Sequence, residues 1–351
     1  MNRRHLFAVA LAGIGCASPE PEARPHPLPL VVPQSSGTTA LLQAVSAPSE
    51  RVVWVSGHAA TVLRTIDGGA TWQRLRVTPG DTSLEFRDVH ALDGNTAWVL
   101  AAGPGARSRI YKTTDAGRTW SEQFVNRDTS AFYDCFTFWD ASHALALSDA
   151  VAGRFVLRRT DDGGAHWNLV PDSVLPPAQH GEGGFAASGT CITGLAGRFA
   201  WVGTGAADTA RVLMTSNRGA TWSVVATPVR GGSFAGLATV AFRDTLHGLV
   251  AGGNLADANA RTDNVAVTAD GGRTWTLAGR PQFPGAVYGA AYVDARPIVA
   301  AVGPRGLDIS WNDGVVWAGL DTLAYWSVGF GSSRVGWAVG PHGRITRIRL
   351  P

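Results

Sequence analysis

Charged residues are scarce in this chain: they make up 16% of its 351 residues, and long polar runs are absent. A segment stays disordered when it has little apolar surface to bury and a high net charge, and this sequence has neither property. The net charge is +3, and no concentrated basic stripe accompanies it. The composition therefore argues against a disordered chain, and we expect no nucleic-acid partner.

Helical periodicity is also missing beyond the N-terminal segment. In its place, 43 glycines and 19 prolines separate short alternating or β-branched apolar runs. Apolar runs of this length, bounded by turn residues, are typical of strands. We therefore expect an all-β fold.

The first residues predict export. A positive stretch, Asn2 to His5, precedes a short apolar stretch from Leu6 to Ile14. The apolar stretch is too short to cross a bilayer as an anchor helix, which favours a signal peptide over residues 1–16.

The end of this signal peptide permits two interpretations. Gly13-Ile14-Gly15-Cys16 resembles a bacterial lipobox, with Gly13 in place of the usual aliphatic residue, and would make Cys16 the lipidated residue. The alternative is ordinary cleavage after Ala10-Leu11-Ala12. Residues 17–27 form a proline-rich spacer that suits a tether. We therefore expect a lipoprotein of the periplasm or outer membrane, held at the membrane through its lipid at most.

A repeat organises the rest of the chain. Six segments share the template Ser/Thr-x-Asp-x-Gly-x-Thr-Trp, with Asn at the Asp position in the fourth and sixth copies, and successive copies lie 42 to 55 residues apart. They begin at Thr65, Thr113, Thr160, Thr215, Thr268 and Ser310. Each copy lies in a unit of four predicted strands, which for the first unit are residues 41–46, 52–56, 61–65 and 72–77. Regular four-stranded units of this length indicate the blades of a β-propeller.

The last unit predicts how the ring closes. After the sixth copy the sequence has three strands, at 325–330, 336–339 and 344–350, but no fourth. The apolar run at 29–32 supplies it and thereby removes an exposed sheet edge. We predict a single seven-bladed propeller over residues 28–351, with its ring closed by an N-terminal strand.

The template has a structural role in each blade. An Asp or Asn at this turn accepts hydrogen bonds from downstream amides, and the following Gly takes a positive φ. The Trp that opens the fourth strand is large and flat enough to fill the space between blades. The structural residues predicted in this way are Asp67, Asp115, Asp162, Asn217, Asp270 and Asn312 at the turn, and Trp72, Trp120, Trp167, Trp222, Trp275 and Trp317 after it.

This template is the Asp-box, and the chain resembles BNR-repeat propellers. With its six Asp-boxes, its GWAVG-type second strands and its late-closed seventh blade, it is most similar to the photosystem II assembly and stability factor family over residues 28–351. The resemblance implies a monomeric, non-enzymatic platform without cofactor, which binds an envelope or membrane protein. That family also presents a basic patch, to which no arginine cluster of this sequence corresponds.

A glycoside hydrolase is the alternative, because sialidases share Asp-boxes. The Arg-Ile-Pro motif of sialidases is absent. Strand order nevertheless brings Asp88, Asp134, Asp149 and Glu182 to one face of blades two to four, where two carboxylates at 5–9 Å would serve as acid and nucleophile or base. The same carboxylates would suit a hard cation such as calcium, but turn capping is the favoured role.

Candidate contact residues follow from the rule that inter-blade connections and the turns after second strands share one face. Long connections on a rigid scaffold are where binding residues concentrate, and the longest here is 171–185. The candidates are His58, Arg87, Tyr133, Ser188, Asn254, Tyr288, Arg305, Tyr325, Trp326 and His342. The histidines have no close metal-ligand spacing, so we expect no metal.

Cys135 and Cys191 align at equivalent positions of the innermost strands of neighbouring blades. A disulfide needs Cα atoms within about 7 Å, which is near the spacing of such strands. The sequence leaves their pairing open and favours two buried thiols.

Overall fold

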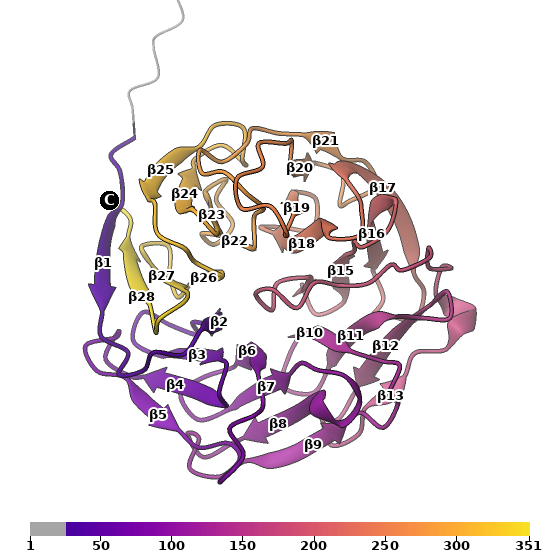
Figure 1. Ribbon diagram of the computed structural model, residues 1–351, viewed down its shortest axis with the longest axis horizontal. Coiled ribbons are helices and arrows are strands. Elements are labelled where there is room, and N and C mark those ends of the chain that lie inside the picture. Colours follow the sequence, from indigo (N-terminus) through magenta and orange to yellow (C-terminus); the bar gives the residue numbers. More distant parts are fainter. Residues whose placement is uncertain (1–25) are drawn as a thin grey trace, which may run out of the picture.

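The computed structural model describes residues 26–351, which form a ring of seven four-stranded antiparallel sheets (Figure 1). In each blade the first strand lies next to the centre of the ring and the last lies at the rim. The predicted all-β, seven-bladed propeller is confirmed. The signal peptide, Cys16 and most of the tether lie outside the described residues.

The blades follow one another in sequence order. Blade 1 contains β2 (Leu42–Ser46), β3 (Val53–Gly57), β4 (Thr61–Thr65) and β5 (Gln73–Leu75); blade 2 contains β6 (Phe86–Ala91), β7 (Ala97–Ala101), β8 (Arg109–Thr113) and β9 (Ser121–Val125). Blade 3 contains β10 (Tyr133–Phe138), β11 (Ala144–Val151), β12 (Arg154–Thr160) and β13 (Asn168–Leu169); blade 4 contains β14 (Ile192–Leu195), β15 (Phe199–Gly203), β16 (Thr209–Thr215) and β17 (Ser223–Arg230).

The second half of the ring repeats the plan. Blade 5 contains β18 (Ala235–Phe242), β19 (Gly248–Asn254), β20 (Val265–Thr268) and β21 (Thr276–Leu277); blade 6 contains β22 (Gly289–Tyr292), β23 (Val299–Gly303), β24 (Gly306–Ser310) and β25 (Ala318–Asp321). Blade 7 contains β26 (Ser327–Phe330), β27 (Val335–Val339), β28 (Ile345–Arg349) and β1 (Leu30–Gln34). Two short 3-10 turns, η1 (Gly105–Arg107) and η2 (Asp172–Val174), lie in the connections.

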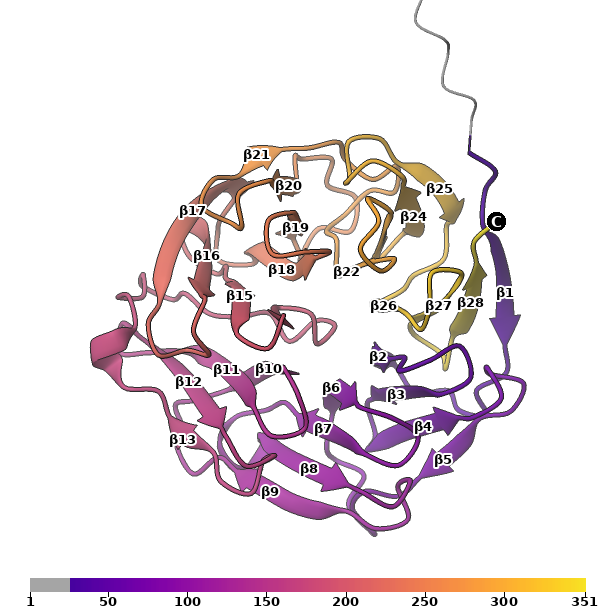
Figure 2. The ribbon, with the colours of Figure 1, turned by 180° about the vertical axis from the view of Figure 1, so that it is seen from behind.

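The N-terminal strand closes the ring as predicted. β1 pairs antiparallel with β28, with Leu30 opposite Arg349, and lies outside it in both views (Figure 2). Gln34, at the end of β1, links the two blades at the seam. Its Nε2 donates to Gly68 O of the first Asp-box at 3.0 Å, and its Oε1 accepts from the Trp337 indole of β27 at 3.2 Å. Closure therefore joins blade 7 to blade 1 through the Gln34 side chain as well as through the chain that runs from β1 to β2.

Each Asp-box is a closed hydrogen-bonded turn. In the first box, Thr65 Oγ1 accepts from the Gly69 amide at 2.9 Å and donates to Asp67 Oδ1 at 2.7 Å. The amide of Thr71 donates to the same carboxylate oxygen at 3.0 Å. The sixth box keeps this pattern with Asn312 in place of Asp and Ser310 in place of Thr. The bonds therefore need an oxygen acceptor at this position and not a charge.

The cores lie between blades. Trp120 packs against the core between blades 1 and 2, Trp167 lies in that between blades 2 and 3, and Trp317 lies in that between blades 5 and 6. A second set of tryptophans, Trp54, Trp98, Trp201 and Trp337, is fully buried on second strands. Two of these indoles bond the Asp-box turn of the next blade, Trp98 at Gly163 O and Trp201 at Gly271 O. Neighbouring blades are thus held by apolar contact and by directed hydrogen bonds.

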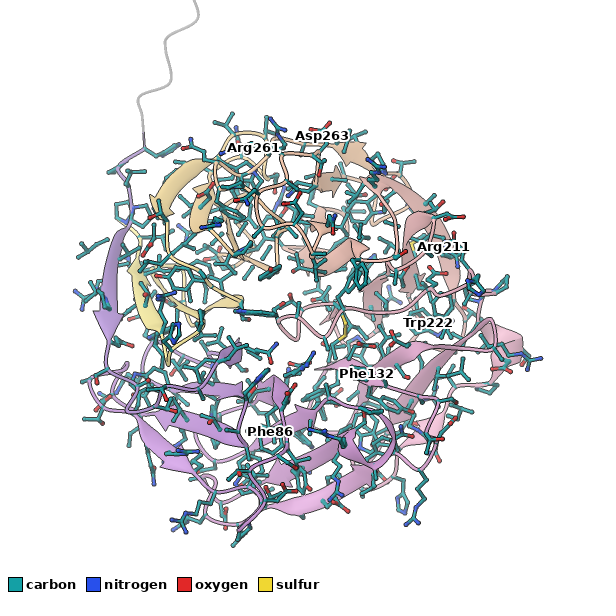
Figure 3. All side chains as sticks on the ribbon, in the orientation of Figure 1. Phe86, Phe132, Arg211, Trp222, Arg261 and Asp263 are labelled. Carbon is teal, nitrogen blue, oxygen red and sulfur yellow. A yellow bond between two sulfur atoms is a disulfide. The ribbon has the colours of Figure 1, made fainter. Side chains whose placement is uncertain are left out.

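The two cysteines are joined, so the expectation of two free thiols is wrong. Cys135 lies on β10 and Cys191 directly precedes β14, and their Cα atoms are 6.2 Å apart. First strands of neighbouring blades converge toward the centre of the ring, which brings these positions within disulfide range. The bond lies near the centre in Figure 3.

Within residues 26–351, no helix is long and apolar enough to cross a membrane.

Candidate functional site

The antiparallel blades give the ring two faces. The turns between second and third strands and the connections between blades share one face, which we call the mouth face. The Asp-boxes, which join third to fourth strands, share the opposite face. The predicted contact residues therefore belong to the mouth face, around the central channel.

A segment of the connection between blades 3 and 4 closes this channel. Residues 182–190, here named the plug loop, reach the middle of the ring between β10 and β26 (Figure 1). Gln43 Nε2 of blade 1 donates to Ala187 O at 3.2 Å, and Ser327 Oγ of blade 7 donates to Ser188 O at 3.2 Å. Ser188 Oγ in turn donates to Tyr288 O, beside blade 6, at 2.6 Å. Ala187 and Ser188 are consequently buried.

The loop is also fastened to blades 2 and 5. Arg87 Nη1, on β6, donates to Ala186 O at 3.4 Å. On the other side, Thr190 Oγ1 donates to Thr239 Oγ1 of β18 at 2.8 Å, and Thr190 O accepts from the amide of Val240 at 2.8 Å. Five blades other than the two it connects to therefore bond the plug loop, which makes it a part of the scaffold.

Three of the four predicted carboxylates lie against the plug loop. Asp88 is buried and accepts from the Phe136 amide at 2.8 Å. Burial raises the pKa of Asp88 well above its usual range. A Cβ on Gly189 would come within 2.2 Å of Asp88 Oδ1, so the loop backbone lies directly on this carboxyl group.

Asp134 and Asp149 are neighbouring carboxyl groups against which the plug loop packs. Burial, followed by the negative charge of Asp149, raises the pKa of Asp134 well above its usual range. Burial raises the pKa of Asp149 to about 6, against a hydrogen bond from the Gly184 backbone. A Cβ on Gly183 would approach Asp149 Oδ1 to 1.9 Å, so glycine is required for the loop to lie so close. Two neighbouring carboxyl groups removed from water hold a proton at pH values where exposed ones are ionised.

Glu182 anchors the base of the loop and has no capacity left for catalysis. Its buried carboxylate forms an ion pair with Arg211 of β16, which lies on blade 4 (Figure 3). Oε1 also accepts from Thr204 Oγ1 at 2.6 Å, and Oε2 accepts from the Gln179 amide at 2.8 Å. Both oxygens are therefore occupied by structural donors.

This arrangement suits a closed scaffold better than a hydrolase. A glycosidase needs its acid and its nucleophile or base on either side of an open cleft. Five cavities lie among residues 26–351 at other places, and none of these five is lined by any of the four carboxylates. Within residues 26–351, no three His, Cys, Asp or Glu side chains gather as a metal site. Two of the carboxyl groups, those of Asp134 and Asp149, accept hydrogen bonds from plug-loop amides, at Ala186 and Gly184 respectively.

Several predicted contact residues are buried, and Tyr133, Tyr325 and Ser188 are therefore wrong as contact candidates. Tyr133 is 0% exposed, and its hydroxyl accepts from Arg158 Nε at 2.6 Å. Tyr325 is also 0% exposed and donates to Asp321 at 2.8 Å. Ser188 belongs to the plug loop. These side chains face the inter-blade cores or the filled channel, where a partner has no access.

Other predicted residues do reach the surface. Trp326 is half-buried and its ring lies 4.7 Å from that of Tyr288, which is 8% exposed. Arg305 and His342 are exposed in turns of blades 6 and 7, and Asn254 is exposed at the end of β19 in blade 5.

His58 and Arg87 lie together on blades 1 and 2. Both contact Glu85, His58 at 3.5 Å and Arg87 at 2.6 Å. Burial lowers the pKa of His58. This group therefore presents a largely neutralised network rather than a free cation.

Sequence reasoning missed two features of the mouth face. The first is the closure of the channel by the plug loop, for which Gly183-Gly184 and the small residues after them were the available signal. The second is a cavity where β1 closes the ring, of which only His342 was predicted. Its other polar residues come from segments far apart in the sequence, so no local pattern indicates it.

The repeats, the ring and the closing strand define the chain as an Asp-box, or BNR-repeat, β-propeller. Residues 31–135 match the model of the family described as photosynthesis system II assembly factor YCF48. This match bears out the resemblance seen in the repeats. No curated protein matches the chain.

Solved structures show the same fold at low identity. A structure of YCF48 bound to D1 peptide is 17% identical, with a TM-score of 0.63 over 93% of this chain and 98% of that one. YCF48 from Cyanidioschyzon merolae is 16% identical, with a TM-score of 0.64 over 91% and 98%. A GH74 xyloglucanase from Xanthomonas campestris is 17% identical, with a TM-score of 0.59 over 90% of this chain and 53% of that one.

Proposed function

We propose that this propeller is a non-enzymatic platform that binds another protein through its mouth face. The observation that carries the proposal is the plug loop, which fills the channel and lies against Asp88, Asp134 and Asp149, the first two of which are buried. A propeller closed in this way offers a broad surface to a partner and no central cleft to a small substrate. The similarly folded YCF48 bound to D1 peptide supports a peptide or protein as the ligand.

The contact region that fits this role lies on blades 6 and 7. There the half-buried Trp326 packs against Tyr288 with its ring tilted by 36°, and the exposed Arg305 lies in the turn between β23 and β24. Trp, Tyr and Arg supply most of the energy in protein interfaces when they lie at the centre of a contact. The aromatic pair is already ordered, so little conformational entropy is lost on binding.

The partner is an envelope or membrane protein, and the propeller is a monomer held near the membrane by its N-terminal segment. The sequence of residues 1–27 supports this location, since it reads as a lipoprotein signal followed by a tether.

The proposal is tested by affinity capture from native membranes with the tagged mature protein as bait. A Trp326→Ala/Arg305→Ala variant should lose the bound protein, because both anchors are removed from the surface. Arg127→Ala, which removes an exposed arginine from the connection between blades 2 and 3, is the matched control and should retain it. Equal recovery with all three baits, or glycosidase activity in the purified protein, would contradict the platform role.

A further inference from the structure

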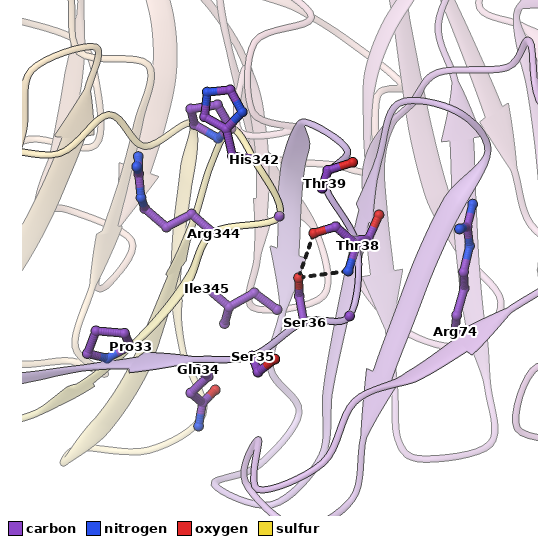
Figure 4. Close-up of a pocket in the computed structure, with 13 residues that line it drawn as sticks. Pro33, Gln34, Ser35, Ser36, Thr38, Thr39, Arg74, His342, Arg344 and Ile345 are labelled. Atoms are coloured by element: carbon purple, nitrogen blue, oxygen red, sulfur yellow. Dashed lines mark hydrogen bonds between the residues drawn. The ribbon is translucent and has the colours of Figure 1, made fainter.

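A separate cavity lies at the seam of the ring, away from the plug loop. It has a volume of about 650 Å³ and lies between the connection from β1 to β2 and the turn from β27 to β28 (Figure 4). We name it the seam pocket; it is lined by residues 33–39, Arg74 and residues 341–345. This volume is in the range of small-molecule and peptide side-chain sites.

The floor of the seam pocket is fixed by the two loops that form it. The amide of Gly343 donates to Ala40 O at 2.8 Å, and the amide of Leu42 donates to Gly340 O at 3.1 Å. A Cβ on Gly343 would meet Thr38 O at 1.8 Å, so the loops touch through their backbones. A Cβ on Gly37 would meet nothing within 4 Å. The pocket is therefore open toward Gly37 and rigid beneath it.

The charged side chains that line the seam pocket are all positive. Its lining includes Arg74 and Arg344 but no Asp or Glu. Within residues 26–351, neither arginine forms an ion pair. Arg344 is held in place because it donates to Ala324 O at 2.6 Å and lies 5.6 Å from the centre of the Tyr325 ring.

The remaining donors are free for a ligand. Arg74 is exposed and has only a long contact, 3.5 Å, to Ala59 O. The hydroxyl groups of Ser35 and Thr39 are exposed, as is His342. Figure 4 shows Arg344 and His342 on one side of the Thr38–Thr39 loop and Arg74 on the other. Guanidinium and hydroxyl groups in this arrangement suit the oxygens of an anion.

We propose that the seam pocket binds carboxylates of an acidic peptide segment. Unpaired arginines recognise carboxylates, and two of them in the lining of one cavity suit a segment with more than one acidic side chain. A single inorganic ion would leave most of the volume empty. The inference rests on the proposed function only for the source of the segment, since the affinity of the pocket is measured with a defined peptide.

The test is a fluorescence titration of the full mature protein with a short acetylated peptide of alternating Asp and Glu, at low salt. Thr39→Glu places a negative charge in the pocket without removing any hydrogen bond, whereas Thr39→Gln adds a neutral side chain of similar size. We expect Thr39→Glu to weaken binding at least tenfold and Thr39→Gln to leave it within about twofold. Equal affinities of the two variants would overturn the proposal.

A second pair of variants controls for indirect effects of the substitutions at Thr39. Arg74→Ala should weaken binding roughly tenfold, and Arg127→Ala, with the same change in net charge, should not. Inorganic phosphate should compete with the peptide at the same site. If an Asn/Gln peptide binds as tightly as the acidic one, the pocket does not recognise carboxylates and the proposal fails.

The two proposals can fail separately. If membrane capture fails but the acidic peptide binds and responds to Thr39→Glu, only the platform role is contradicted. If capture succeeds but the affinity for the peptide does not change in Thr39→Glu and Arg74→Ala, only the proposal for the seam pocket is contradicted.

Discussion

At the residue scale, the role of Glu182 in the structure differs from the role that the sequence suggests. In the sequence it is an acidic residue in a long glycine-containing connection, which suggests a site. In the structure its carboxylate is 0% exposed and is paired with Arg211, whose side chain is 15% exposed. A buried ion pair of this kind contributes little over an apolar pair, but removal of one partner leaves the other charge without compensation.

We therefore predict that Glu182→Gln lowers the free energy of unfolding by about 3 kcal/mol, because Arg211 loses its counter-charge in a buried setting. Urea unfolding followed by tryptophan fluorescence measures this. Asp172→Asn is the matched control. It breaks the ion pair between Asp172, which is 46% exposed, and Arg154, which is 69% exposed. We expect this change to lower the free energy of unfolding by less than about 1 kcal/mol. Equal small effects would mean that Glu182 does not anchor the plug loop.

At the scale of elements, the plug loop is a part of the fold whose stability depends on protonation. It lies on Asp134 and Asp149, whose pKa values are raised by burial, while the positive charge of Arg87 acts in the opposite direction on Asp134. A carboxyl group with a raised pKa binds its proton more tightly in the folded state than in the unfolded chain. Its contribution to stability is therefore complete below about pH 4 and is lost as the pH rises through about 6.

We predict that Asp149→Asn becomes more stable relative to the wild type as the pH rises from 4 to 7, by roughly 3 kcal/mol in all. The comparison with the wild type is needed because burial lowers the pKa of His90 to about 4, which gives an opposite slope in the same range. Unfolding free energies at several pH values measure the difference. Asp128→Asn is the control, because hydrogen bonds from Ser130 lower the pKa of Asp128 and place its titration below this range. A difference that does not change with pH would contradict the buried carboxyl pair.

For the whole molecule, the repeat determined most of what could be predicted. Six Asp-boxes at regular spacing give the blades, and the missing fourth strand of the last unit gives the closure by β1, because both are local patterns repeated along the chain. Contacts across the ring have no such pattern. The distance between Cys135 and Cys191 depends on how far the first strands converge, which blade number and tilt decide together.

The same limit applies to the candidate site. Position in a blade predicts the face on which a residue lies, and Arg305, Asn254 and His342 are exposed there. It does not predict whether the side chain points to the surface or into an inter-blade core. Tyr133 and Tyr325 point into such cores. The path of the plug loop is also unpredictable, since its bonds join Gln43, Thr239 and Ser327 from distant parts of the chain.

The central claim is that the plug loop closes the channel as a fixed part of the ring. Hydrogen exchange of the full mature protein, resolved to peptides, tests it most directly. We predict that the amides of Gly183, Gly184 and Ala186 exchange as slowly as those of the first strands β2, β18 and β26, because they donate to Gly205 O, Asp149 and Asp134 respectively. Exchange as fast as that of the exposed connection at 255–263 would contradict the claim and would reopen the channel as a site for a small ligand.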